Sequence, residues 1–148
     1  MQTKFTPLSG HDPKQIPYDP QAEIEQQIVQ SFEVSKKNLQ TDYIDSLILH
    51  SPVSPHSQLM LAWNAMEKIR QSGEVSLLGI SNCYDLDILK RLYTDTVVKP
   101  SIVQNRFYAQ TAYDKDLRHW CLEHNIVYQS FWTLTANPHL LTVKVQKL

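Results

Sequence analysis

Short apolar runs alternate with helical patterns along this chain of 148 residues. The runs that fit buried strands are 2–5, 44–49, 75–80, 101–104 and 126–131. Between them, apolar side chains recur three or four positions apart, which predicts amphipathic helices. Strands that alternate with helices predict a parallel sheet with right-handed crossovers, so we expect an α/β domain over residues 1–148.

Turn and capping residues indicate where these elements begin and end. Residues 6–20 are rich in proline and predict a loop. Asp19-Pro20 fits an N-cap followed by proline in the first turn of a helix, and Asp85 fits the cap of a later helix. Ser54-Pro55 opens a second helix, and Gly73 stands where this helix must stop.

Composition narrows the class of protein. Hydrophobic residues are 42% and charged residues 20%, which is typical of a globular domain. The net charge of −1, with both signs interspersed, argues against nucleic acid or a membrane surface as partner. No secretion signal is evident at the start, and Cys83 and Cys121 form no CxxC pair, so we expect a cytoplasmic protein with two reduced thiols.

The residues at the carboxyl ends of the predicted strands carry the candidate chemistry. Ligands of parallel α/β folds bind at this edge of the sheet. A single histidine or glutamine there is usually structural, but polar ends on four successive strands favour a site. The strand-end residues are Lys4, His50, Ser81, Asn82, Gln104 and the aromatic Phe131.

These residue types suit one particular pair of ligands. A lysine beside a neutral histidine can polarise a carbonyl oxygen. Ser, Asn and Gln together offer the donors and the acceptor that a carboxamide needs, and an aromatic side chain can stack on a planar ring. The set therefore indicates a nicotinamide held over a carbonyl.

Three stretches resemble, in order and spacing, successive segments of the aldo-keto reductases: "DYIDSLILHSP", "AMEKIRQSGEVSLLGISN" and "KPSIVQNRFY". The resemblance implies a partial TIM-type (β/α) barrel and NADPH-dependent reduction of a small aldehyde or ketone without a metal. By resemblance, His50 orients the substrate carbonyl, and Lys4 lowers the pKa of a catalytic tyrosine.

The resemblance also implies the cofactor contacts. Ser81, Asn82 and Gln104 match residues that bind the nicotinamide carboxamide. Phe131 stands where the family usually has a tyrosine that stacks on the ring. The following "WTLT" departs from the family's usual Ser-Pro-Leu-Gly, so the family's pyrophosphate contacts are not carried over to these residues.

Other family elements fall outside this sequence. The tyrosine acid and its partner aspartate precede the strand of Lys4 in the family, and the adenosine-binding segment follows residue 140. We therefore expect about five of the eight β/α units, truncated at both ends, with open sheet edges that allow self-association. Lys144 and Lys147 do not resemble the family's basic motif and are interpreted as solvated charges.

Alternative interpretations remain open. The chain could be a non-catalytic fragment or interaction module, the relic of a reductase gene, with at most weak nucleotide binding. An open flavodoxin-like sheet is a weaker alternative, since the loop after the first strand is too rich in proline for phosphate binding. We expect no metal site, because His119 and His124 are five residues apart on a helix and face different directions.

Overall fold

Five parallel strands form one open sheet in the computed structural model, which describes residues 1–142. Their order in the sheet is the order in the chain, and each strand pairs with the next in parallel. The strands are β1 (Gln2–Phe5), β2 (Ile44–Leu49), β3 (Val75–Ser81), β4 (Ile102–Arg106) and β5 (Val127–Phe131). The predicted α/β class, with five parallel strands alternating with helices, is confirmed.

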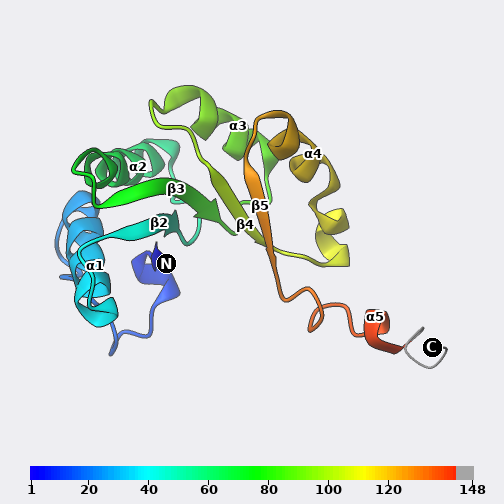
Figure 1. The fold of residues 1–148 in the computed structure, drawn as a ribbon, viewed down its shortest axis with the longest axis horizontal. Helices are drawn as coiled ribbons and strands as arrows, with labels where there is room; N and C mark the ends of the chain where they lie inside the picture. The colour runs from blue at the N-terminus through cyan, green and yellow to red at the C-terminus, as the bar shows by residue number, and fades with distance from the viewer. Residues whose placement is uncertain (143–148) are drawn as a thin grey trace.

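Four helices cover one side of this sheet. They are α1 (Ile24–Leu39), α2 (His56–Gln71), α3 (Leu86–Asp95) and α4 (Lys115–Glu123). Figure 1 shows them along the outer side of a sheet that curves around an open inner face. Two 3-10 turns, η1 (Leu8–Gly10) and η2 (Ala109–Asp114), and the short α5 (His139–Thr142) complete the described chain. The inner face is therefore the side of the sheet that these four helices leave uncovered.

The hydrophobic core lies between the sheet and these helices. Its largest fully buried side chains are Phe5, Ile28, Ile44, Leu47, Leu49, Leu59, Trp63, Met66, Leu78, Ile80 and Leu89. Trp63 of α2 is 0% exposed, and its indole N–H donates a hydrogen bond to the carbonyl of Val98, 2.9 Å away. The same side chain thus fills the core and ties α2 to the segment that leads into β4.

Two predicted boundaries differ from the observed ones by two residues or more. The helix predicted to begin at Asp19-Pro20 begins at Ile24, because the Asp19 carboxylate accepts the N–H of Gln21 in a turn of its own. The strand predicted over 101–104 continues to Arg106, because β5 pairs with it as far as Phe131.

Other local predictions hold. The Asp85 carboxylate caps α3 by accepting the backbone N–H groups of Asp87 and Ile88. Gly73, with a φ of 84°, adopts the left-handed conformation that glycine tolerates just beyond α2. Cys83 and Cys121 are unpaired, and burial raises the pKa of each thiol to about 12.

Within residues 1–142, no helix combines the length and the apolar character that crossing a membrane requires. The interpretation of Lys144 and Lys147 as solvated charges falls outside the described residues.

Candidate active site

Alternation along the strands places the predicted residues on the inner face. Thr3 donates a hydrogen bond to Ser35 of α1, and Leu49, Ile80 and Val103 belong to the helix-side core. Successive side chains of a strand point to opposite faces, so the residue that follows each of these faces inward. These inward residues are Lys4, His50, Ser81 and Gln104.

His50 and Lys4 form the end of the site on β1 and β2. The Cα of Lys4 pairs with that of Ile48, two residues before His50, and both side chains are half-buried. Burial lowers the pKa of the Lys4 amine. Burial also lowers the pKa of His50, and the nearby charges of Lys4 and His11 lower it further. His50 is therefore a neutral imidazole at pH 7, with one N–H to donate.

The loop after β1 closes against this imidazole. A Cβ added to Gly10 would lie 3.6 Å from Nδ1 of His50 and only 2.7 Å from Cγ2 of Thr6. No side chain fits at position 10 without displacing Thr6, so the absence of a Cβ allows η1 to lie beside His50.

The lowered pKa of His50 predicts a stability that falls in mild acid. Below about pH 6.5, the unfolded chain takes up a proton at His50 that the folded chain resists, so unfolding becomes easier as the pH falls. His50→Gln removes this difference, and we expect its stability relative to the unchanged chain to rise between pH 7 and pH 5. Urea unfolding at both pH values measures this, and parallel profiles would contradict it.

Ser81 and Asn82 join the ends of neighbouring strands. The Ser81 hydroxyl donates to the carbonyl of Gln104 at 2.7 Å, and the Asn82 side-chain N–H donates to the carbonyl of His50 at 2.8 Å. The Tyr84 hydroxyl donates to the Asn82 side-chain oxygen at 3.1 Å. Asn82 has a φ of 51°, a left-handed conformation that asparagine adopts more readily than most residues. Its amide thus holds the end of β3 against the end of β2.

Gln104 presents an acceptor that no described residue satisfies. Its side-chain N–H donates to Oε1 of Gln129 at 2.9 Å, which fixes the orientation of the amide. Its own Oε1 is buried without a hydrogen-bond donor from residues 1–142. A buried acceptor left without a donor costs about 1–3 kcal/mol, so this oxygen favours a ligand that carries an N–H group.

Gln129 is a site residue that the sequence prediction missed. It stands two residues before Phe131, so both side chains lie on the same face of β5. The sequence "IVYQSF" contains enough information to find Gln129, because alternate residues of a strand lie on the same face. Phe131 is half-buried and pairs with Arg106 across the strands, at the far end of the site from His50.

A network of buried side-chain hydrogen bonds connects the strands that carry the middle of the site. Asn105 is 0% exposed, and its side chain both donates to the carbonyl of Cys83 at 2.9 Å and accepts the N–H of Cys83 at 3.0 Å. The same side-chain nitrogen donates to the carboxylate of Asp114 at 2.8 Å, which also accepts the hydroxyl of Tyr128 at 2.9 Å. The network fixes β3, β4 and β5 relative to one another beside Ser81 and Gln104.

Comparison with known proteins identifies the family of this chain. Residues 2–146 match the model of the aldo/keto reductase family. The chain belongs to this family. It is 30% identical over 115 residues to the glyoxal reductase of Bacillus subtilis, covering 78% of this chain and 40% of that protein. It is 28% identical over 120 residues to the NADPH-dependent alpha-keto amide reductase of Saccharomyces cerevisiae, covering 77% and 38% respectively.

Solved structures agree on the fold. The crystal structure of an aldo-keto reductase from a Medee basin deep-sea metagenome library superposes with a TM-score of 0.72 at 22% identity, covering 97% of this chain and 48% of that one. This aldo-keto reductase chain therefore spans about two fifths of the length of the curated relatives and about half of that structure. The predicted partial (β/α) barrel is confirmed.

Proposed function

We propose that this chain provides the carbonyl-orienting and nicotinamide-binding groups of an NADPH-dependent reductase that converts an aldehyde or ketone to an alcohol. The observation that carries the proposal is the buried Oε1 of Gln104, which has no hydrogen-bond donor among residues 1–142 and lies at the same sheet edge as the neutral His50. The curated yeast relative is an NADPH-dependent reductase, which supports the choice of cofactor.

The carbonyl end of the site uses hydrogen bonding and charge. His50 holds one ring proton at neutral pH and donates it in a hydrogen bond to the carbonyl oxygen of the substrate. The ammonium of Lys4 lies nearby, so positive charge faces the oxygen on which negative charge develops. NADPH, when bound, supplies the hydride. The residues of this chain orient the carbonyl and stabilise the developing alkoxide, which takes its proton from water.

The cofactor end of the site fits a nicotinamide. Oε1 of Gln104 accepts an N–H of the carboxamide. The Ser81 oxygen accepts a hydrogen bond of 3.4 Å from the Asn82 side chain, and its second lone pair accepts the other carboxamide N–H. The ring of Phe131 provides a stacking surface at the end of β5. Asn82 holds the ends of β2 and β3 together and does not bind the nicotinamide itself, since its amide is already bonded to His50 and Tyr84.

The first test is NADPH binding by the purified 148-residue chain, followed by nicotinamide fluorescence. We expect saturable binding that Gln104→Ala weakens about tenfold, the effect of losing one hydrogen bond to a buried acceptor. Gln26→Ala, at an exposed position of α1, is the matched control and should leave the affinity unchanged.

The same samples separate binding from turnover. We expect glyoxal, the substrate named for the bacterial relative, to consume the bound NADPH. Binding without consumption would reject reduction by this chain and favour a binding module. If a folded, monodisperse sample showed no saturable binding, both parts of the proposal would be wrong, and only the family membership would stand.

A further inference from the structure

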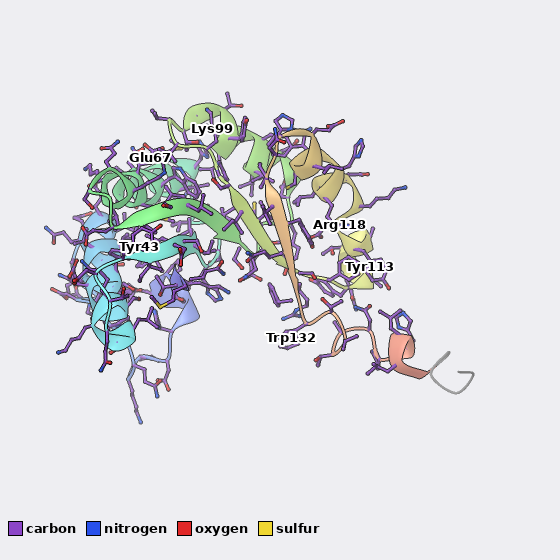
Figure 2. The ribbon with its side chains drawn as sticks, in the orientation of Figure 1. Tyr43, Glu67, Lys99, Tyr113, Arg118 and Trp132 are labelled. Atoms are coloured by element: carbon purple, nitrogen blue, oxygen red, sulfur yellow. The ribbon has the colours of Figure 1, made fainter. Side chains whose placement is uncertain are left out.

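The guanidinium of Arg106 lies close to two aromatic rings at the end of β4. Its Cζ is 4.1 Å from the centroid of the Trp132 ring and 5.3 Å from that of Tyr108. Figure 2 labels Trp132 just beyond the end of β5, where the chain turns towards α5. Stacked arginines of this kind are held in place by cation–π attraction, which restricts their rotamers without neutralising their charge.

The charge of Arg106 has no acidic partner in the described chain. Across residues 1–142, no carboxylate oxygen comes within 4.0 Å of this guanidinium. Its Nε is buried and has no hydrogen-bond acceptor among the same residues. A cation that is partly desolvated and unpaired is costly, and an anionic ligand would remove that cost.

The sheet order shows on which side of the site such an anion lies. Arg106 follows Gln104 by two residues, so it faces inward beside the carboxamide position, and its Cα pairs with that of Phe131. His50 lies on β2, two strands away, which corresponds to about 10 Å. An anion on Arg106 is therefore separated from the carbonyl by the nicotinamide position itself. It belongs to the remainder of the cofactor and not to the substrate.

The loop after β5 is fixed next to this charge. The side-chain amide of Asn137, 1% exposed, donates to the carbonyl of Phe107 at 2.6 Å and to that of Thr133 at 2.9 Å. These bonds hold the segment 132–137 against the end of β4 and keep the Trp132 ring over Arg106. The guanidinium is thus positioned before any ligand arrives.

We propose that Arg106, positioned by Trp132 and Tyr108, binds the diphosphate oxygens of the nicotinamide dinucleotide. The planar guanidinium matches two phosphate oxygens at once, which an ammonium cannot do. The inference rests on the proposed function, because the diphosphate belongs to the cofactor whose nicotinamide is proposed to bind at Gln104.

The test compares ligands with and without phosphate. We expect Arg106→Gln to weaken NADPH and NADH alike by tenfold to a hundredfold, the range for charge-assisted hydrogen bonds. Dihydronicotinamide riboside lacks phosphate and should bind the variant and the unchanged chain equally. Arg106→Lys keeps the positive charge but loses the planar guanidinium. Its affinity for NADPH should lie between that of Arg106→Gln and that of the unchanged chain. Loss of NADPH affinity alone, with NADH unaffected, would assign the 2′-phosphate and overturn the proposal.

Controls separate phosphate binding from packing. Arg118→Gln is the matched variant, since Arg118 is exposed on α4 (Figure 2). Its Cζ also lies close to an aromatic ring, 5.4 Å from the centroid of Phe107. It should leave every affinity unchanged. An equal loss of riboside and dinucleotide affinity in Arg106→Gln would show that Arg106 acts only by packing. No loss of either would also overturn the proposal.

A failure of the proposed function would remain distinguishable. If the riboside did not bind the unchanged chain, titration with inorganic pyrophosphate would still test Arg106 alone. Pyrophosphate binding that disappears in Arg106→Gln would support the anion site apart from the nicotinamide, and absence of binding to the unchanged chain would overturn it.

Discussion

Trp63→Ala is expected to lower the free energy of unfolding by about 3–5 kcal/mol. Trp63 is fully buried between α2 and the sheet, so alanine leaves a large cavity that the surrounding side chains cannot fill. The change also removes the hydrogen bond to the carbonyl of Val98. Small domains are stable by only about 5–15 kcal/mol, so the loss is a large part of the total. Urea unfolding followed by tryptophan fluorescence measures it.

Trp63→Phe is the control for this prediction. Phenylalanine keeps most of the ring but cannot donate to Val98, so we expect a smaller loss, about 1–3 kcal/mol. The decisive result is the order of stability, in which the unchanged chain should be followed by Trp63→Phe and then by Trp63→Ala. An alanine variant as stable as the phenylalanine variant would show that the core does not depend on filling this volume.

Asn105→Leu should cost about 2–5 kcal/mol, although leucine has nearly the same shape. The change leaves both backbone groups of Cys83 without their side-chain partner and removes one donor from the carboxylate of Asp114. Each buried polar group left without a partner costs about 1–3 kcal/mol. Because the network lies behind Ser81 and Gln104, NADPH affinity should fall as well. Urea unfolding and the fluorescence titration measure the two effects separately.

An exposed asparagine provides the comparison for Asn105. Asn64 lies on the solvent side of α2, and Asn64→Leu should change stability by no more than about 0.5 kcal/mol. If the two variants unfolded at the same urea concentration, the network would have no measurable role in stability.

The strands, and the edge of the sheet at which the candidate site lies, were predictable from the sequence for a physical reason. β2 is buried at every position except Asp45 and ends in the apolar run 47–49, and its predicted bounds of 44–49 match the observed ones. Parallel pairing then places every strand's carboxyl end at one edge. For that reason, the inward positions of Lys4, His50, Ser81 and Gln104 followed from strand positions, while their roles remain proposals.

What could not be predicted depends on contacts between distant segments. The Asp19-Pro20 pair fits a helix cap and a separate turn equally well in local sequence. The turn is held against α1 by a hydrogen bond from the backbone N–H of Asp19 to the side-chain oxygen of Gln30, eleven residues further on. The Gln104–Gln129 bond requires the register of β4 against β5. The stacking of Arg106 on Trp132 requires that register and the left-handed backbone of Trp132, with a φ of 55°. No short stretch of sequence contains this information.

The hydrogen bond from Asn82 to the carbonyl of His50 has a consequence for measurement. It links the groups proposed to bind the carbonyl to those proposed to bind the nicotinamide, so the two cannot shift independently. Energetic effects of changes at His50 and at Gln104 should then be non-additive, with a coupling free energy of about 0.5–3 kcal/mol in a double-mutant cycle. By thermodynamic reciprocity, a bound nicotinamide would strengthen carbonyl binding by the same factor that a bound carbonyl strengthens nicotinamide binding.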